Sequence, residues 1–353
     1  MKKQRLLSIL ILFSMLLSSL SLTSCAKPRQ FAAYSLDYFD TATTIKGHET
    51  DKETFDRISG EALALLEEYH RLFTIYTRYE GLENLCTIND LVDGAHRTVT
   101  VDRRIIDMLL YAKEMYAVTN GNLNVAMGSV LSIWHKYRTA GRDEPWAAEL
   151  PPMEKLVEAA RHTSIDDVII DEEACTVFLA DPEMTLDVGA IAKGYAVEMV
   201  AQYLEEQGVN GYILNVGGNV RTVGAKPDGS PWIAGVENPD VESEEAYLAY
   251  LALENESIVT SGSYQRFYEV GDVSYHHIID KDTLMPAEGY LSVSVICLNS
   301  AQGDALSTAL FCMPLEEGMA LVESLADVEV LWVLSDGTPH TSSGFARYTT
   351  TIS

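Results

Sequence analysis

The chain has 353 residues, a formal net charge of −27 and 47% hydrophobic residues. That length is long for one core and short for three domains, and no linker, low-complexity block or repeat divides it, so we expect one elaborated domain. The excess of acidic residues predicts a surface that repels nucleic acid, and we exclude that class of partner. A ligand with phosphate groups would be repelled as well, unless a metal ion, a helix N-terminus or a placed lysine offsets the charge locally.

The N-terminus has the layout of an export signal. Lys2, Lys3 and Arg5 form a positive segment, residues 6–22 form an apolar run interrupted only by serine, and small residues precede Cys25. This order favours a lipoprotein signal, because the apolar run is short for a spanning helix and a cysteine follows it closely. An uncleaved membrane anchor and ordinary cleavage nearby are the alternatives.

The prediction divides the chain into a signal peptide (1–24), a tether (25–30) that carries a lipid on Cys25, and a domain (31–353). The protein would be exported and anchored by that lipid to the outer face of the cell membrane. No later segment is long and apolar enough to span a bilayer. The other cysteines have no CxxC spacing, so we predict no disulfide framework despite the exported location; they are Cys86, Cys175, Cys297 and Cys312.

The first elements are predicted from apolar spacing and end signals. Residues 31–45 alternate loosely and favour a strand, and apolar residues at helical spacing between 55 and 69 predict an amphipathic helix. Asp102 is placed to cap a second helix that runs through Tyr116, and Asn120-Gly121 would end it. A short helix is expected after the two prolines at 151–152.

From about residue 165 the pattern changes to short strands mixed with helices. Without a regular βαβ alternation this mixture favours an α+β fold over a doubly wound sheet. No GxGxxG follows a strand, so a dinucleotide would be held in a non-Rossmann manner. Strands are expected at 168–170, 176–179, 212–216, 232–236, 247–253, 277–279, 291–297 and 328–333, and helices at 191–207, 304–313 and 315–324.

The first segment that carries chemistry is residues 185–196, in which a predicted strand ends at Asp187 and a helix begins after a glycine. The free N–H groups of that helix start would face an anion. Lys193 in its first turns opposes the helix dipole unless an anion lies nearby. The alternative is a solvated lysine with Asp187 as the helix N-cap.

The second segment is Gly217-Gly218, which follows a buried strand. Paired glycines suit a close approach of the backbone to a ligand, but they suit a hairpin turn equally well. From this pattern alone we favour the turn.

The third segment contains adjacent histidines, His276 and His277. In a strand their side chains point to opposite faces, so only one of them would line a given pocket, as a general base or a hydrogen-bond donor. The alternative is a surface histidine beside a core one.

The fourth segment places Asp304 and Thr308 four residues apart, on one helix face. Two such oxygen ligands suit Mg²⁺, which takes few protein groups and completes its shell with water and substrate phosphate. The alternative is Asp304 as a helix N-cap and Thr308 bonded back to its own helix.

Together the four segments supply an anion-facing helix start, a glycine loop, a histidine and a magnesium-type pair, which cleavage of a pyrophosphate requires. In this order they resemble the ApbE family of FAD:protein FMN transferases, and the resemblance extends from about Tyr38 to about Val333. The matching motifs are Asp187-Val188-Gly189-Ala190-Ile191-Ala192-Lys193-Gly194, Asn215-Val216-Gly217-Gly218-Asn219, Thr260-Ser261-Gly262, His277-Ile278-Ile279-Asp280 and Asp304 through Thr308.

The resemblance implies roles for particular residues. The carbonyl of Ala190 with Asp304 and Thr308 would hold Mg²⁺. His277 would act as general base or orient the attacking group, and Asp187 is the alternative acid–base group. The residues implied to contact FAD are Thr41, Asn122, Leu123, Asn124, Asp187, Lys193 and His277.

The implied reaction is an attack by a serine or threonine hydroxyl on the FMN phosphorus of FAD, with AMP as the leaving group. The acceptor would be an exported or membrane redox protein. The rival functions are an FAD pyrophosphatase that uses water and a non-catalytic flavin- or solute-binding lipoprotein. The chain departs from the family pattern at Leu284, where the family usually has glycine, and at Asn122 and Asn124, where an acidic residue is frequent.

Overall fold

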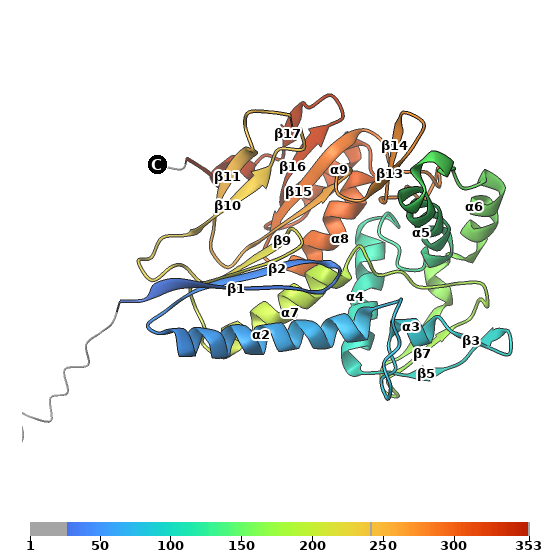
Figure 1. The fold of residues 1–353 in the computed structure, drawn as a ribbon, viewed down its shortest axis with the longest axis horizontal. Coiled ribbons are helices and arrows are strands. Elements are labelled where there is room, and N and C mark those ends of the chain that lie inside the picture. The colour runs from blue at the N-terminus through green and yellow to red at the C-terminus, as the bar shows by residue number, and fades with distance from the viewer. Residues whose placement is uncertain (1–26, 241, 352–353) are drawn as a thin grey trace, which may run out of the picture.

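The computed structural model describes residues 27–240 and 242–351, and its centre is an eight-stranded sheet (Figure 1). Neighbouring strands of this sheet pair antiparallel throughout. The predicted signal peptide and Cys25 lie outside the described residues. In spatial order the strands are β1 (Arg29–Tyr38), β2 (Thr41–Glu49), β8 (Tyr212–Val216), β9 (Asn219–Val223), β12 (Ser257–Gly262), β15 (Tyr290–Cys297), β16 (Glu329–Leu334) and β17 (Pro339–Thr341).

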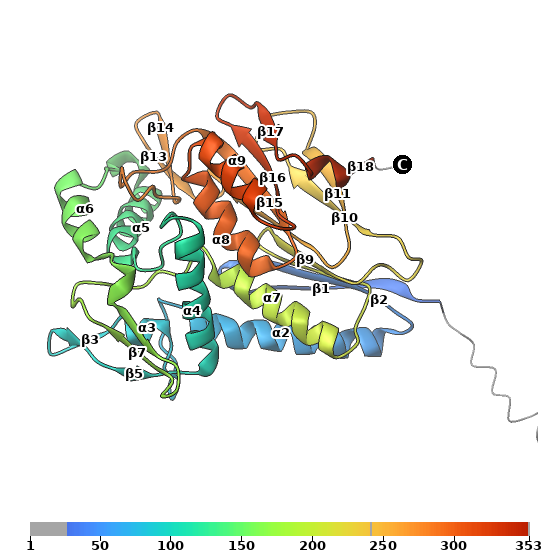
Figure 2. The same cartoon turned by 180° about the vertical axis from the view of Figure 1, so that it is seen from behind.

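Helices cover one face of this sheet (Figure 2). They form because apolar residues recur along one side of each helix and are buried against the sheet and against each other, in the largest apolar core of the described chain. The Asp51 side chain caps the first of these helices by accepting from Thr54 N–H, and Asp102 caps another through Arg104 N–H. The helices are α2 (Lys52–Phe73), α4 (Arg103–Val118), α7 (Ala192–Glu206), α8 (Ser300–Phe311) and α9 (Leu315–Ser324).

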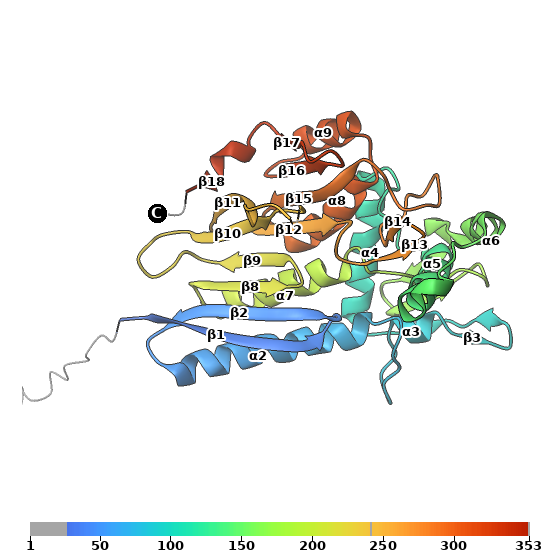
Figure 3. The ribbon, with the colours of Figure 1, turned by 45° about the horizontal axis from the view of Figure 1, so that its top comes forward.

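The opposite face of the sheet carries a smaller three-stranded sheet and a second apolar core. The smaller sheet covers β9, β12, β15 and β16, and Figure 3 shows it in front of that half of the main sheet. Strands β1 and β2 contribute nothing to this second core, although His48 at the end of β2 packs on Trp232 of the smaller sheet. The covering strands are β10 (Trp232–Glu237), β11 (Tyr247–Leu253) and β18 (Thr349–Thr350).

A side lobe with its own apolar core stands at the end of the sheet where the β1–β2 hairpin turns. Trp134 and Leu156 from its helices pack there with Tyr268 and Leu284. The lobe and the adjoining short elements are α3 (Leu85–Ile88), β3 (Leu91–Val92), β4 (Ala95–His96), β5 (Val99–Thr100), α5 (Gly128–Asp143), α6 (Met153–Ala159), β6 (Val168–Asp171), β7 (Thr176–Leu179), β13 (Phe267–Val270) and β14 (Val273–His276).

The structure confirms the α+β prediction and most of the expected elements. Residues 31–45 are not one strand: Phe39 and Asp40 have φ of 53° and 52°, and they form the turn of the β1–β2 hairpin. The helix expected at 304–313 begins earlier, at Ser300, because Asn299 caps it by accepting from the N–H groups of residues 301 and 302. Helix α5 and strand β12 were not predicted.

The described cysteines are all free thiols. Burial raises the pKa of Cys297 and of Cys312 to about 12. Among residues 27–240 and 242–351, we find no helix with the length and apolarity needed to cross a bilayer.

Candidate active site

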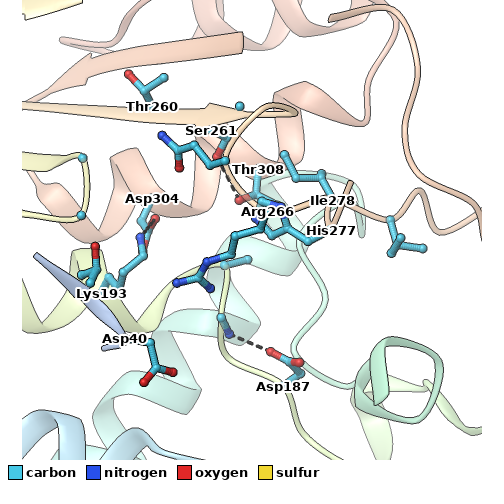
Figure 4. A pocket seen from close by; sticks show the side chains of 18 of the residues that line it. Asp40, Asp187, Lys193, Thr260, Ser261, Arg266, His277, Ile278, Asp304 and Thr308 are labelled. Carbon is cyan, nitrogen blue, oxygen red and sulfur yellow. Dashed lines mark hydrogen bonds and ion pairs between the residues drawn. The ribbon is translucent and has the colours of Figure 1, made fainter. Parts of the chain in front are cut away.

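A cavity of about 620 Å³ lies where the β1–β2 turn, the β8–β9 turn, the starts of α7 and α5 and the face of α8 meet. Every residue that the sequence assigned to FAD, Mg²⁺ or catalysis lines it. In Figure 4 Lys193 and Asp304 lie on one side of the view and Asp187 and His277 on the other. The predicted residues that line the cavity are Thr41, Asn122, Leu123, Asn124, Asp187, Ala190, Lys193, His277, Asp304 and Thr308.

Asp187 lies on an irregular segment, not at the end of a strand as predicted, and other parts of the chain hold that segment in place. The Asn89 side chain makes two hydrogen bonds to the backbone of Leu186. Leu186 N–H donates to Asn89 Oδ1 at 2.7 Å, and Asn89 Nδ2 donates to the Leu186 carbonyl at 2.9 Å. Asp187 N–H donates to the Val125 carbonyl at 2.8 Å. These bonds fix the backbone immediately before the Asp187 side chain.

Asp187 is not the N-cap of α7, because its carboxylate accepts from Gly189 N–H at 2.9 Å and Ile191 occupies the cap position without a side-chain bond. Burial raises the pKa of Asp187, while the Gly189 bond and the nearby His135 and Arg138 act in the opposite direction. A carboxyl group in a cavity whose pKa is raised by burial is a candidate for proton exchange with a ligand.

Asp304 lies in the middle of α8, so the N-cap alternative for this residue is wrong. The residue is 4% exposed, its carboxylate accepts from Gly194 N–H at 2.8 Å, and Lys193 Nζ lies 3.4 Å from its other oxygen. Lys193 Nζ also donates to Asn219 Oδ1 at 2.8 Å. Asp304 therefore joins the start of α7 to α8, and it holds Lys193 toward the cavity instead of in solvent.

The start of α7 offers fewer free N–H groups than the sequence suggested. Ala192 N–H donates to the Val188 carbonyl at 2.9 Å, and Gly194 N–H is taken by Asp304. The positive charge that faces the cavity at this point is therefore mainly the ammonium group of Lys193.

Thr308 lies one helical turn after Asp304 and lines the same cavity. Its hydroxyl is 3.4 Å from Ser261 Oγ, and Ser261 Oγ lies 2.8 Å from Ser307 Oγ. Ser307, not Thr308, bonds back to its own helix, through the Asp304 carbonyl at 3.0 Å. The Thr308 hydroxyl is thus held at the cavity wall by a weak contact and is available to a ligand.

The two adjacent histidines divide as predicted, although His277 lies just past β14 and not within a strand. His276 faces away from the cavity, where its Nε2 bonds the Ala287 carbonyl at 2.8 Å and its ring packs edge-on against Phe311. His277 lines the cavity, and its buried Nδ1 has no hydrogen-bond partner among the described residues. Burial, with help from Arg266 and Arg138, lowers the pKa of His277 to about 3, so its imidazole is neutral at pH 7.

The glycine loop is both the turn and a cavity wall. Gly217 and Gly218 have φ of 55° and 89° and join β8 to β9. A side chain at Gly217 would also place its Cβ 2.3 Å from Thr41 Oγ1, so this turn requires glycine for its conformation and for the close approach of the β1–β2 turn.

The amides of Asn122 and Asn124 are used in part to build their own loop. Asn122 Nδ2 donates to the Thr119 carbonyl at 3.0 Å. Asn124 accepts from Ala126 N–H at 2.9 Å and donates to the Thr163 carbonyl at 2.9 Å. Their predicted contact with flavin therefore falls mainly to Asn122 Oδ1 and to backbone atoms.

Sequence reasoning missed a group of cavity residues. Tyr76, His135 and Arg138 line one end, with the Tyr76 and His135 rings stacked at 5.3 Å and Arg138 Nη2 3.0 Å from His135 Nδ1. Arg266 lines the same cavity from the segment before β13. With Lys193 these arginines supply the local positive charge that an anionic ligand needs in so acidic a chain. The spacing of Val130, Leu131, Trp134 and Arg138 along α5 was the signal that would have found this wall.

The oxygen atoms that line the cavity fit a magnesium ion. The described residues contain no cluster of three or more His, Cys, Asp or Glu side chains suited to a metal. The donor set is instead a carboxylate (Asp304), a hydroxyl (Thr308) and the peptide oxygen of Ala190, all at one cavity. Such hard and few oxygen ligands suit Mg²⁺, which completes its shell with water and phosphate oxygens.

Comparison with known proteins gives consistent relatives. The model of the ApbE family matches residues 39–332. A Klebsiella pneumoniae protein named FAD:protein FMN transferase is 34% identical over 74% of this chain and 81% of its own length. A Vibrio cholerae protein of the same name is 30% identical over 94% of this chain and 95% of its own.

Solved structures agree with these sequence matches. The ApbE protein from Thermotoga maritima superposes with a TM-score of 0.79 at 26% identity, and the comparison covers 92% of this chain and all (100%) of that one. The flavin transferase ApbE from Vibrio cholerae has a TM-score of 0.74 at 27% identity, with 91% and 99% covered. The extent of these matches in sequence and in fold establishes that the chain belongs to the ApbE family.

Proposed function

We propose that this protein transfers FMN from FAD to a serine or threonine hydroxyl of an acceptor protein and releases AMP. One observation carries the proposal: residues from five separate segments, each singled out by a sequence motif, line one cavity. The names of the relatives point to the same reaction. In this reaction the acceptor oxygen forms a bond to the FMN phosphorus, the bond from that phosphorus to the AMP phosphate breaks, and the hydroxyl proton passes to a base.

The cations of the cavity would bind the pyrophosphate. Lys193 is fixed by Asn219 and Asp304 and so can contact phosphate oxygens without being ordered at the moment of reaction. Arg138 and Arg266 line the same cavity and add positive charge. Mg²⁺, held by Asp304, Thr308 and the Ala190 carbonyl, would supply further charge neutralisation on the phosphates.

His277 is the candidate base, because it is neutral and its buried Nδ1 has no protein partner in the described chain. Its low pKa makes it a weak base. The negative charge of bound FAD would raise that pKa toward the range in which proton transfer is efficient. Asp187 is the alternative base, since burial raises its pKa and it lines the same cavity.

We further propose that the chain is an exported lipoprotein, attached to the outer face of the cell membrane through Cys25, and that its acceptor is an exported or membrane redox protein. The support is the order of a positive segment, an apolar run and a cysteine in residues 1–25. Labelling with a radioactive fatty acid, lost in Cys25→Ser, tests the lipid attachment.

The reaction is tested by incubating the full chain with FAD, Mg²⁺ and a flavin-free acceptor domain, then measuring acceptor mass and AMP. We expect a mass gain of one FMN, lost with EDTA and in Asp304→Ala. Asp56→Ala is the matched control, because Asp56 also lies on a helix beside a lysine but is exposed and does not line the cavity.

The other outcomes separate the rival functions. AMP and free FMN without any gain in acceptor mass would identify a hydrolase. Tight FAD binding without AMP would leave only a flavin-binding role. Full transfer by Asp304→Ala would remove the metal assignment while leaving the transferase itself standing.

A further inference from the structure

A continuous row of side chains joins the cavity to the edge of the main sheet. Antiparallel partners present their side chains on the same face, and the register links Tyr34 to Thr44, Thr44 to Asn215, Asn215 to Val220 and Val220 to Ile258. Asn215, Val220 and Ile258 line the cavity. Tyr34 therefore lies on the face that forms the cavity, two strand spacings or about 10 Å from Asn215.

A second sheet covers this face over one half of the main sheet and leaves it open over the half that ends in β1. Over β9, β12, β15 and β16 the face packs against β10 and β11. Among the described residues, no side chain of β1, β2 or β8 belongs to that second apolar core. At the far end of β2 the ring of His48 packs on Trp232 of β10, with centroids 5.2 Å apart, and we call the rest of this outward surface the shelf (Figure 3). The outward residues of the shelf are Gln30, Ala32, Tyr34, Leu36, Ala42, Thr44, Lys46, Ile213 and Asn215.

The shelf has the chemistry of an interaction surface. Tyr34 is 72% exposed, and Leu36, which lies where the register shifts between Ser35 and Tyr38, is 79% exposed, whereas most large apolar side chains of the described chain are buried. The outward side chains include one cation, Lys46, and no carboxylate, although the chain as a whole carries −27. The shelf is also bounded by β1, an edge strand whose outer backbone groups have no strand partner within the described residues.

We propose that the shelf docks the acceptor protein, with apolar side chains of the acceptor packed on Tyr34 and Leu36 beside its reactive hydroxyl. This inference rests on the proposed transfer to a protein hydroxyl. The same β1–β2 hairpin that carries Tyr34 and Leu36 places its turn residue Asp40 and the first residue of β2, Thr41, in the cavity wall. A polypeptide lying on the shelf is thereby directed along the hairpin into the site.

Continuity with the cavity selects this occupant over the two others that an apolar edge invites. A second copy of the chain paired along β1 would cover the shelf but would bring no hydroxyl to the cavity wall. A bilayer would contact Tyr34 and Leu36 but would not follow the row through Thr44 to Asn215. Only an acceptor uses both the exposed apolar surface and its connection to the site.

The test compares the full chain with Tyr34→Ser/Leu36→Ser, and the matched control is Ile169→Ser/Leu298→Ser. Ile169 and Leu298 are also exposed apolar residues, at 49% and 51%, but neither lines the cavity or the shelf. Each variant is assayed with two acceptors: a folded exported redox domain purified without its FMN, and a short synthetic peptide spanning the hydroxyl of that domain. FAD binding is followed by quenching of flavin fluorescence.

The shelf variant should lose about tenfold or more in kcat/KM for the folded domain, mainly through KM, because two apolar anchors are removed. Its FAD affinity and its rate with the peptide should match those of the wild type and of the control variant. A benzophenone amino acid at position 34 should crosslink to the folded domain, and the same group at position 169 should not.

Equal kcat/KM for the folded domain in the shelf variant and the wild type would overturn the docking role. So would a parallel loss with the peptide and in FAD binding, which would indicate disturbance of the cavity. A wild-type dimer that dissociates in the shelf variant during sedimentation, or phosphatidylglycerol vesicle binding lost in that variant, would assign the shelf to the other occupants. Absence of transfer by the wild type to either acceptor would instead refute the proposed function.

Discussion

Replacing Gly194 with alanine tests whether the close packing of α7 against α8 both stabilises the fold and positions Asp304. Gly194 lies in the first turn of α7 and is buried where α7 crosses α8. A Cβ at this position would lie 2.3 Å from the Ser300 carbonyl oxygen, 2.4 Å from Asp304 Cβ and 3.0 Å from Asn219 Nδ2. Carbon atoms pack best at about 3.5–4.0 Å, so α8 would have to move away by about 1 Å.

The magnitude follows from two opposing effects. Overpacking a core costs about 1–3 kcal/mol, and the upper part of that range applies because a carbonyl oxygen of α8 cannot swing aside as a side chain does. Alanine gains about 1 kcal/mol over glycine in a helix interior. We therefore expect Gly194→Ala to lower the free energy of unfolding by about 1–2 kcal/mol. Because the same shift displaces Asp304, transfer should fall by about a hundredfold.

Gly60→Ala is the matched control. Gly60 is also inside a helix, α2, but it is exposed and a Cβ there meets no atom within 4 Å. This variant should gain up to about 1 kcal/mol in the free energy of unfolding and keep full activity. In urea unfolding, one alanine substitution should therefore stabilise the protein and the other destabilise it. If Gly194→Ala proved as stable and active as Gly60→Ala, the close contact of α7 with α8 would not be what positions Asp304.

Two further substitutions test buried ionisable side chains. The folded protein keeps His277 neutral down to a pKa of about 3 while the unfolded chain protonates near 6.5, so stability present above pH 6.5 is lost as pH falls. Between pH 7 and pH 5 the free energy of unfolding should therefore fall by about 2 kcal/mol less in His277→Gln than in the wild type, as measured by urea unfolding at each pH. The same pH dependence of stability in both proteins would contradict a neutral buried imidazole. Glu198 is 3% exposed, and its carboxylate accepts from Ser300 N–H at 2.8 Å and from Arg221 Nε at 3.2 Å. Because Glu198→Gln leaves the buried Arg221 without its charged partner, it should lower the free energy of unfolding by about 3 kcal/mol. An unchanged melting temperature would contradict this.

The site was predictable where a local pattern carries the chemistry. The i, i+4 spacing of Asp304 and Thr308 places both on one face of any helix, so their shared cavity follows from the sequence alone. What each carboxylate contacts was not predictable. Both Asp187 and Asp304 were open to interpretation as N-caps, and in the fold Asp187 bonds Gly189 N–H while Asp304 bonds Gly194 on another helix. The second bond joins residues 110 apart in sequence, and no local pattern encodes such a contact.

The β1–β2 hairpin was mispredicted for a related reason. Its turn uses Phe39 and Asp40 at positive φ, and neither residue is the glycine or asparagine that usually announces such a turn. The Phe39 N–H donates to His70 Nδ1 at 3.2 Å and the two rings pack edge-on, so α2 stabilises the turn from outside the hairpin. Tertiary contacts here supply what the turn sequence lacks.

In the loop after His277, distant residues likewise stabilise a backbone conformation that is unfavourable for Leu284. It stands where the family usually has glycine, and its φ of 60° is a left-handed conformation that costs a leucine about 1–2 kcal/mol. The loop nevertheless closes, with Leu284 N–H bonded to the Asp280 carbonyl at 2.9 Å and its own carbonyl accepting from Trp134 Nε1 at 2.9 Å. Leu284 is only 8% exposed, and burial of its side chain contributes about 1.5–3 kcal/mol, enough to offset the strain. Trp134 belongs to α5, the helix that the sequence did not predict. Leu284, which departs from the family motif, and Trp134, which bonds its carbonyl, are therefore 150 residues apart in sequence and meet only in the folded lobe.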